Sequence, residues 1–211
     1  MKAFWLNKNH SSNLIVFFSG WGMDEKSVIL DYKDYDFIVF YDYENFEIEK
    51  SLIDEINAYK NVYLIAWSMG VIASTILINK IKNLKQKIAI NGTLSIIDDK
   101  FGISNKIFDA TLNNLSPDSI KMFFKNMGYS DFKEPNRTFE SQLNELKNIK
   151  TFYKANNFSF DFDKIIISKK DIIVPFKNQK RAWDGKNCIF FDSGHYVFNL
   201  FKSWEDIINA R

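Results

Sequence analysis

Three side chains that together could perform nucleophilic catalysis stand far apart in the chain. Ser68, Asp171 and His195 each come shortly after a short apolar run. A serine hydroxyl is a weak nucleophile near neutral pH, so it needs a base within hydrogen-bond distance. That base, a histidine, in turn needs a carboxylate that fixes its tautomer and stabilises its charged form. These residue types, in this order along the chain, predict a Ser–His–Asp set in which Ser68 attacks a carbonyl carbon.

The stretch around Ser68 gives the first structural support for this chemistry. Residues 61–72 read NVYLIAWSMGVI, an unbroken apolar run followed at once by a segment with helical character. An apolar run without alternation predicts a strand buried on both faces. A serine on a sharp turn between strand and helix is the nucleophile elbow of α/β-hydrolases, and Ala66 and Gly70 supply the small flanking residues that such a turn needs. The alternative is that Ser68 only caps a core helix.

A second loop could stabilise the negative charge that develops on the attacked carbonyl. The predicted strand at 14–18 ends in the sequence SGWG at 19–22. Two glycines around Trp21 allow a tight turn whose backbone N–H groups stay free. In α/β-hydrolases this loop gives one oxyanion donor, and the residue after the nucleophile gives the other. The predicted donors are therefore the backbone N–H groups of Trp21 and Met69; the alternative is an ordinary turn with Trp21 packed in the core.

The elements that must position these groups alternate along most of the chain. Strands are predicted at 14–18, 36–41, 62–66, 87–90, 163–168 and 186–192, and helices at 48–59, 69–81, 178–183 and near the end of the chain. This alternation is typical of a mostly parallel sheet with helices on both faces. Between 101 and 157 the pattern is helical only, with helices expected at 106–115, 117–127 and 138–154. We therefore expect an α/β-hydrolase core formed by 1–99 and 158–211, with a helical lid inserted at 100–157.

The predicted topology brings the three catalytic candidates to one edge. Each follows the carboxyl end of a predicted strand, the edge where open α/β sheets build their sites. Asp98 and Asp99 also follow a strand and are alternative acids to Asp171. His10 precedes the first firmly predicted strand, so no role is expected for it.

The bulk properties exclude several other classes of function. The chain has 211 residues, 46% of them hydrophobic, and a net charge of +2, which predicts one domain and gives no reason to expect a nucleic-acid partner. A single cysteine, Cys188, excludes an internal disulfide and fits a reducing compartment. Without an apolar signal segment or a membrane-length apolar run, a cytoplasmic protein is expected. Two histidines without metal-ligand spacing predict no metal, and no cofactor is expected.

Motifs spread along the chain carry a family resemblance. They are FSGWG at 18–22, YDY at 41–43, AWSMGV at 66–71, NGT at 91–93, FGI at 101–103, IF at 107–108, TL at 111–112 and HYVF at 195–198. In these motifs the sequence resembles the BioG-type pimeloyl-[acyl-carrier protein] methyl ester esterases of the biotin pathway, which have an α/β-hydrolase fold. The sequence departs from the family at Leu94, Ser95 and Ser104, where turns containing proline are expected, and much of 129–157 carries no matching motif.

The resemblance implies a serine esterase that needs no cofactor and acts on a methyl-capped pimeloyl chain carried by acyl-carrier protein. It implies catalytic roles for Ser68, Asp171 and His195, and oxyanion donation by Trp21 and Met69. Five apolar residues could line an acyl tunnel, or could equally be helix packing: Trp67, Ile103, Phe108, Met122 and Phe123.

Acyl-carrier proteins are acidic, so basic residues of the helical insertion are candidates for steering the carrier. They are Lys121, Lys125, Lys133, Arg137, Lys147 and Lys154. A solvated lysine-rich surface is the alternative for each of them. The protein is expected to act as a monomer. Two other functions stay open: a general acyl carboxylesterase or thioesterase, and a non-catalytic binding protein of hydrolase fold, against which the intact Ser–His–Asp set argues.

Overall fold

A single seven-stranded sheet organises the molecule, and the computed structural model describes all residues, 1–211. Its strand order is β1-β3-β2-β4-β5-β6-β7, and every neighbouring pair is parallel except β1 with β3. The strands are β1 Lys2–Asn7, β2 Asn13–Phe18, β3 Asp36–Tyr41, β4 Asn61–Trp67, β5 Leu84–Ile90, β6 Lys164–Ser168 and β7 Cys188–Phe191. The predicted mostly parallel sheet is therefore confirmed.

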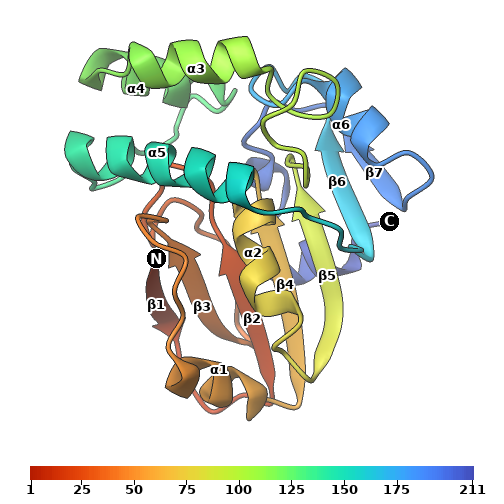
Figure 1. The fold of residues 1–211 in the computed structure, drawn as a ribbon. Coiled ribbons are helices and arrows are strands. Elements are labelled where there is room, and N and C mark those ends of the chain that lie inside the picture. Colours follow the sequence, from red (N-terminus) through yellow and green to blue (C-terminus); the bar gives the residue numbers. More distant parts are fainter.

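Helices connect these strands and also form a separate group above them. The helices are α1 Lys50–Asn57, α2 Gly70–Ile78, α3 Asn105–Asn113, α4 Pro117–Asn126, α5 Phe139–Ala155, α6 Phe176–Ala182 and α7 Trp204–Asn209, with a 3-10 turn η1 at Phe198–Leu200. Figure 1 shows α2 lying across one face of the sheet, while α3, α4 and α5 lie together beyond the carboxyl ends of the central strands. No helix is both long enough and apolar enough to span a lipid bilayer.

The central strands are buried because helices cover both faces of the sheet. Every residue of β3 is buried, and so is every residue of β2 after its first. A strand covered on both faces does not need alternating polarity, which explains the apolar runs in the sequence. The buried hydrophobic residues form one cluster that includes Phe108, Phe124 and Leu146 from α3, α4 and α5. The helical group therefore packs on the same core as the sheet.

Strand β1 was not predicted from the sequence. Residues 2–7 form the edge of the sheet, pair only with β3 and are exposed or half-buried. The four apolar residues of β1 at 3–6 form a run as short as those of the buried strands, but the run lies at an exposed edge of the sheet with one neighbouring strand.

Hydroxyl side chains fix the starts of the three inserted helices. Ser104 caps α3 by accepting from Ile107 N–H, and Thr138 caps α5 by accepting from Ser141 N–H. Ser116 forms a capping box with α4, whose first residue is a proline. Such caps satisfy backbone donors that a helix leaves unpaired at its start. The sequence of 100–157 therefore defines its own helix boundaries.

Candidate active site

A strained turn presents Ser68 at the carboxyl edge of the sheet. Strand β4 ends at Trp67 and α2 begins at Gly70, so only two residues make the connection. Ser68 has φ 57°, a left-handed conformation that is uncommon for a residue with a side chain. A Cβ atom on Gly70 would lie 2.3 Å from the carbonyl oxygen of Phe18, so only glycine allows α2 to approach β2 this closely. The turn has the geometry of a nucleophile elbow.

The structure brings Ser68, His195 and Asp171 into one hydrogen-bonded chain. His195 Nε2 lies 2.9 Å from Ser68 Oγ, and His195 Nδ1 lies 2.8 Å from Asp171 Oδ2. All three residues are at most 5% exposed. An ionised carboxylate only accepts hydrogen bonds, so Nδ1 carries the proton and Nε2 faces the hydroxyl as an acceptor. This arrangement can take the hydroxyl proton as Ser68 attacks.

Four donors fix the carboxylate of Asp171. Its Oδ1 accepts from the backbone N–H groups of Ile173 at 2.9 Å and Val174 at 3.0 Å. Its Oδ2 accepts from Gln179 Nε2 at 2.9 Å as well as from His195. Because both oxygens are occupied, the carboxylate has one orientation, directed at the imidazole. Gln179, a buried residue of α6, was missed in the sequence; the only available signal was a polar side chain in the helix that follows Asp171.

Two side chains from neighbouring strands hold the loop that carries His195. The carbonyl oxygen of His195 accepts from Trp67 Nε1 at 3.2 Å and from Asn91 Nδ2 at 2.8 Å. Asn91 also bonds Ser168, through its Nδ2 to Ser168 Oγ at 2.8 Å and its Oδ1 from Ser168 N–H at 2.7 Å. The ends of β4, β5 and β6 are thereby tied to the histidine. The NGT motif was noted in the sequence, but this role of Asn91 was not predicted.

The alternative acids have other partners. Asp98 Oδ1 accepts from the backbone N–H groups of Lys100 and Phe101, and Asp99 Oδ1 accepts from Asn105 N–H. Both carboxylates therefore shape the turn before α3, and neither bonds His195.

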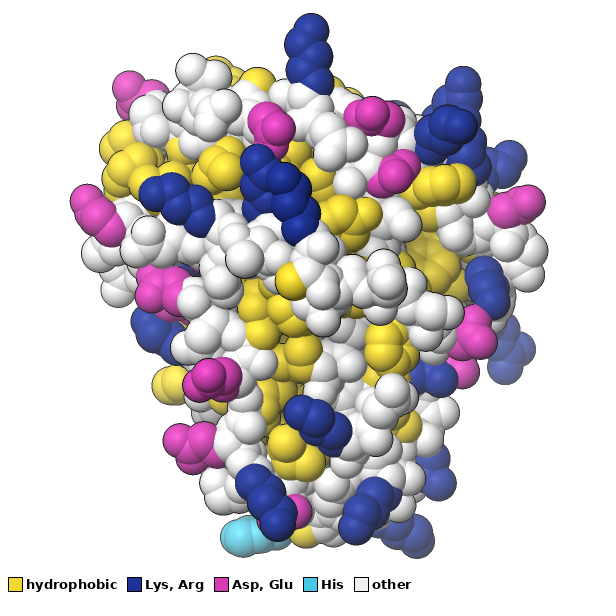
Figure 2. Space-filling model, in the orientation of Figure 1, with side chains coloured by type: hydrophobic (Ala, Val, Ile, Leu, Met, Phe, Trp, Pro, Cys, Tyr) yellow, Lys and Arg dark blue, Asp and Glu magenta, His cyan; other side chains and the backbone are white.

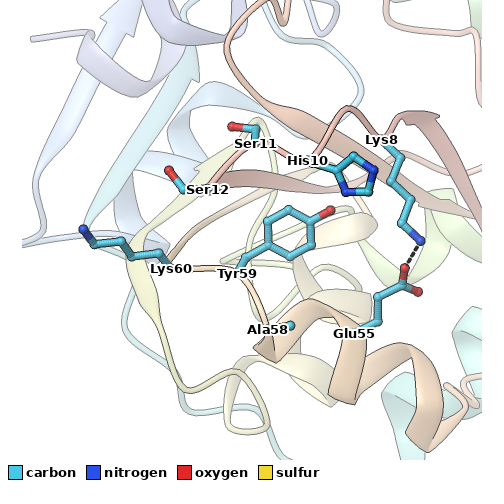
Figure 3. A pocket seen from close by; sticks show the side chains of 8 residues that line it. All are labelled: Lys8, His10, Ser11, Ser12, Glu55, Ala58, Tyr59 and Lys60. Carbon is cyan, nitrogen blue, oxygen red and sulfur yellow. Dashed lines mark hydrogen bonds and ion pairs between the residues drawn. The ribbon is translucent and has the colours of Figure 1, made fainter.

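His10 lies at the opposite edge of the sheet. It lines a surface pocket of about 380 Å³ together with residues at the amino ends of β2 and β4, beside an ion pair between Lys8 and Glu55 (Figure 3). This pocket is separated from Ser68 by the length of β4. No group of three or more His, Cys, Asp and Glu side chains is arranged to hold a metal ion.

Two unpaired backbone N–H groups border Ser68. The N–H groups of Trp21 and Met69 donate to no acceptor within the protein. Strands β2 and β4 are neighbours in parallel register, so the loop after β2 lies beside the elbow. A Cβ atom on Gly20 would lie 3.5 Å from Ser68 Cβ. The expected oxyanion loop is thus adjacent to the serine.

The expected acyl-chain residues have different environments. Phe123 packs edge-on against Trp21 of the oxyanion loop, with 4.9 Å between ring centroids. Met122 is 56% exposed on α4, whereas Ile103 and Phe108 are buried in the core. Trp67 is fully buried beneath the His195 loop. Its indole supports the backbone of His195, so we assign it to positioning the histidine.

The segment after α4 covers the histidine loop. Tyr196 N–H donates to the carbonyl of Met127 at 2.9 Å, and the rings of Tyr129 and Tyr196 stack with 5.0 Å between centroids. Burial raises the pKa of Tyr196 far above its usual range, so its hydroxyl stays neutral and donates to the carbonyl of Ser27 at 3.1 Å. These contacts attach the segment after α4 to the loop that carries His195.

Arg137 is not a surface residue, which corrects its expected role in steering a carrier. Its side chain is 4% exposed and forms ion pairs with Asp42 at 2.7 Å and Glu145 at 3.2 Å. A guanidinium paired in the interior has no free charge to offer a partner. The five lysines of the set are exposed.

The strand order and the strand–turn–helix at Ser68 place the chain in the α/β-hydrolase fold class. A lipase-esterase related protein from Clostridium acetobutylicum shares the fold, with a TM-score of 0.55, 15% identity, and coverage of 94% of this chain and 93% of that one. So does the RedJ thioesterase from Streptomyces coelicolor, with a TM-score of 0.58, 10% identity, and coverage of 94% and 89%.

Comparison with families is more specific. Residues 1–207 match the family model described as "Pimeloyl-ACP methyl esterase BioG", and the chain belongs to this BioG family. The crystal structure of BioG from Haemophilus influenzae superimposes with a TM-score of 0.86 at 28% identity, and covers 97% of this chain and 98% of that one. The expected family is thereby confirmed.

A further relative is a longer protein. The chain is 37% identical over 201 residues to a malonyl-[acyl-carrier protein] O-methyltransferase from Bacteroides fragilis. The match covers 89% of this chain but only 40% of that protein. More than half of the length of that relative therefore lies outside the match with this chain.

Proposed function

We propose that this protein is a serine esterase that removes the methyl group from pimeloyl-[acyl-carrier protein] methyl ester during biotin precursor synthesis. The observation that carries the proposal is the hydrogen-bonded chain Ser68–His195–Asp171 beside two unpaired backbone N–H groups. Membership of the BioG family supports the choice of substrate.

The reaction follows from the positions of these groups. Ser68 Oγ attacks the ester carbonyl carbon while His195 Nε2 takes the hydroxyl proton. The N–H groups of Trp21 and Met69 bind the oxyanion of the tetrahedral intermediate, and each such donor contributes about 3–4 kcal/mol in comparable enzymes. Collapse of the intermediate breaks the bond to the methoxy oxygen, and methanol leaves with the proton from His195. Water then repeats the sequence on the acyl-enzyme and releases the pimeloyl carboxylate and Ser68.

The longer relative supports a methyl ester on a carrier protein as the substrate. A methyltransferase that acts on a carrier-bound carboxyl group makes the type of ester that a BioG-like esterase would remove. The matched region covers 40% of that relative, so the rest of its length can hold a separate methyltransferase domain. We therefore assign to the region shared with this chain the removal of the methyl group.

We further propose that residues 100–157 form a lid. Ser68 is 4% exposed, and the carbonyl of Met127 at the end of α4 is bonded to the histidine loop, so we expect α4 and the turn after it to move when a substrate enters. A surface hollow of about 300 Å³ lies on this segment and is lined by Lys121, Lys125, Tyr129 and Phe132 among others. Tyr129 and Phe132 also line a neighbouring hollow that includes Tyr196.

Basic side chains beside these hollows offer a surface for an acidic carrier. Figure 2 shows Lys and Arg side chains projecting from the helical group, with Asp and Glu between them. The charge is therefore local, not a uniform basic patch. We place carrier docking at Lys121 and Lys125, because they line the hollow that lies beside Tyr129, the residue stacked on the loop of His195.

The test of the reaction compares products from the purified protein and pimeloyl-[acyl-carrier protein] methyl ester. Mass spectrometry of the carrier distinguishes loss of the methyl group from loss of the whole acyl chain, which a thioesterase would release. We expect only the methyl group to leave, and Ser68→Ala to lower the rate at least about 10³-fold without loss of the fold. Release of the acyl chain instead would establish a thioesterase, and a folded Ser68→Ala variant with the rate of the wild type would exclude Ser68 as the nucleophile.

The choice of acid has its own matched control. Asp171→Ala should impair hydrolysis severely, because His195 loses the partner that fixes its tautomer. Asp98→Ala and Asp99→Ala should keep their activity, since those carboxylates cap a turn. The reverse pattern of activities would show that Asp98 or Asp99, and not Asp171, is the catalytic acid.

The docking surface is tested by charge reversal. The double variant Lys121→Glu, Lys125→Glu should raise KM for the carrier-linked ester and leave KM for free dimethyl pimelate unchanged. The same reversal at Lys82 and Lys85, exposed residues at the amino end of β5, is the control. If the two double variants changed KM equally, or if KM changed equally for both substrates, the proposed docking site would be excluded.

A further inference from the structure

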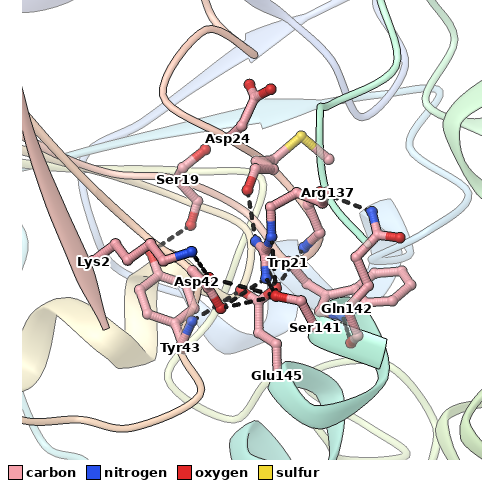
Figure 4. Close-up of polar contacts among 12 residues, drawn as sticks. Lys2, Ser19, Trp21, Asp24, Asp42, Tyr43, Arg137, Ser141, Gln142 and Glu145 are labelled. Carbon is pink, nitrogen blue, oxygen red and sulfur yellow. Dashed lines mark hydrogen bonds and ion pairs between the residues drawn. The ribbon is translucent and has the colours of Figure 1, made fainter. Parts of the chain in front are cut away.

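Helix α5 bonds directly to the loop that carries the proposed oxyanion donor Trp21 (Figure 4). Trp21 Nε1 donates to the carbonyl of Gln142 at 2.8 Å. Gly22 is held on both of its backbone groups: its N–H donates to Glu145 Oε2 at 3.0 Å, and its carbonyl accepts from Gln142 Nε2 at 3.1 Å. Gly22 has φ 77°, so this turn suits glycine and leaves the backbone accessible to the helix.

Arg137, just before α5, extends the same set of contacts. Its Nη1 donates to the carbonyl of Met23 at 2.8 Å and pairs with Glu145 Oε2 at 3.2 Å. Its Nη2 pairs with Asp42 Oδ1 at 2.7 Å. Three consecutive residues of the loop are therefore bonded to Arg137, Gln142 and Glu145, which we call the α5 clamp.

Glu145 also connects the loop to the end of β3. Its Oε1 accepts from the N–H of Tyr43 at 3.2 Å, and the side chain is fully buried. The hydroxyl of Tyr43 donates to the carbonyl of Ser19 at 2.7 Å, at the start of the oxyanion loop. One carboxylate thus joins the loop after β2, the loop after β3 and the inserted helix, although the proposed chemical steps do not use it.

We propose that the α5 clamp positions the oxyanion donor: the inserted helix, through Glu145 and Gln142, holds the backbone N–H of Trp21 where the oxyanion forms. This inference rests on the proposed function. Donors stabilise an oxyanion fully only when they are fixed before the charge appears, since reorientation during the reaction costs free energy. The insertion at 100–157 then completes the site as well as covering it.

The clamp requires the charged form of Glu145. A carboxylate accepts at both oxygens, and here Oε1 faces one backbone N–H while Oε2 faces another N–H and Arg137. An amide in the same place would turn its NH₂ group toward one of these donors. Burial raises the pKa of Glu145 to about 7, Asp42 acts in the same direction, and Arg137 and the two N–H groups oppose the rise.

The test compares Glu145→Gln with Glu140→Gln, the same change at an exposed position of the same helix. Amide hydrogen exchange of the peptide at 19–24 measures the clamp without reference to catalysis. A trifluoromethyl ketone measures the oxyanion site: Ser68 Oγ adds reversibly to its carbonyl carbon, the proton passes to His195, and the new oxyanion lies between the donors. Titration with a fluorophosphonate counts the competent sites.

For Glu145→Gln we expect faster exchange at 19–24, a kcat at least about tenfold lower with KM nearly unchanged, and an inhibition constant for the ketone raised by a similar factor. The titrated fraction of sites should equal that of the wild type. Exchange and ketone affinity equal to those of Glu140→Gln would overturn the proposal, and so would a loss of kcat explained entirely by fewer titrated sites. If Glu145→Gln fails to fold, Gln142→Met, which removes only the donor to the carbonyl of Gly22, takes its place.

Failure of the proposed function gives a different result. A wild type that neither hydrolyses esters nor binds the ketone would exclude an esterase, and with it the catalytic part of this inference. The exchange comparison would still show whether Glu145 holds the loop.

Discussion

Replacement of Arg137 by methionine tests how much the buried charges behind the oxyanion loop contribute to stability. The side chain of Arg137 is 4% exposed and faces two buried carboxylates, Asp42 at 2.7 Å and Glu145 at 3.2 Å. Methionine is shorter but unbranched and of only slightly smaller volume, so the variant removes the charge and its donors without leaving a large cavity. Both carboxylates would then stay in the interior without their main partner.

The expected loss of stability depends on the partners that Asp42 and Glu145 keep in the variant. Removing one partner of a buried ion pair typically destabilises a protein by about 3–5 kcal/mol, because the other charge stays buried. Here Glu145 keeps two backbone donors, and Asp42 keeps the exposed amine of Lys2 at 2.8 Å. We therefore expect the lower end, about 3 kcal/mol, which for a protein of this size lowers Tm by about 6–12 °C.

The cost should depend on pH in a defined direction. Burial raises the pKa of Glu145 from 4.5 to about 7, and Asp42 raises it as well, whereas Arg137 is the strongest influence that lowers it. The other titratable groups near this carboxyl are the hydroxyl of Tyr43 and the N-terminal amine. When the pKa of a carboxyl group is higher in the folded protein than in the unfolded one, its contribution to stability is complete below the pKa of the unfolded state. That contribution is lost as the pH rises through the pKa of the folded state. Loss of Arg137 raises the pKa of Glu145 further. The difference in the free energy of unfolding between the variant and the wild type should therefore be about 1 kcal/mol larger at pH 8 than at pH 6.

Urea denaturation at both pH values measures these differences, with Arg181→Met as the matched control. Arg181 is exposed and bonds only the carbonyl of Lys100 and the side chain of Asn178, so its loss should cost less than about 1 kcal/mol. An Arg137→Met variant as stable as Arg181→Met, or one whose deficit grows toward pH 6, would refute the account of this cluster.

Two further predictions concern the elbow and the histidine loop. Gly70→Ala places a Cβ atom 2.3 Å from the carbonyl oxygen of Phe18, so we expect a loss of at least about 2 kcal/mol in urea denaturation; an unchanged midpoint would show that α2 can shift freely. Asn91→Ala removes the donor to the carbonyl of His195 and both bonds to Ser168, so kcat should fall about tenfold with little change in KM. A variant of normal kcat would mean that Trp67 alone holds the loop.

Much of the architecture was predictable because residues close together in the sequence determine where the strands and helices lie. Most of the central strands contain an apolar run, and Ser68, Asp171 and His195 follow the carboxyl ends of β4, β6 and β7. Parallel strands place those ends at one edge, so the meeting of the three side chains follows from topology. Their catalytic roles stay a prediction. The helix caps Ser116 and Thr138 are likewise local signals, and they explain why the bounds of α4 and α5 agree with the sequence to within a residue or two.

What the sequence could not show depends on contacts between distant residues. Arg137 has the pattern of an exposed lid residue, and only the fold brings it against Asp42 and the loop after β2. The same holds for Glu145, which lies more than one hundred residues from Gly22 in the chain. Trp67 is another example: the sequence shows only that it neighbours Ser68, and the fold shows that its indole bonds the carbonyl of His195.

The central claim is that Ser68 is a nucleophile activated by His195. The most direct measurement is intact-mass and peptide mapping of the protein after reaction with a fluorophosphonate, which labels only an activated serine. We predict one adduct, located on the peptide that contains Ser68, absent in Ser68→Ala and formed far more slowly in His195→Gln. Labelling that persists in Ser68→Ala, or that proceeds at the wild-type rate without His195, would contradict the account.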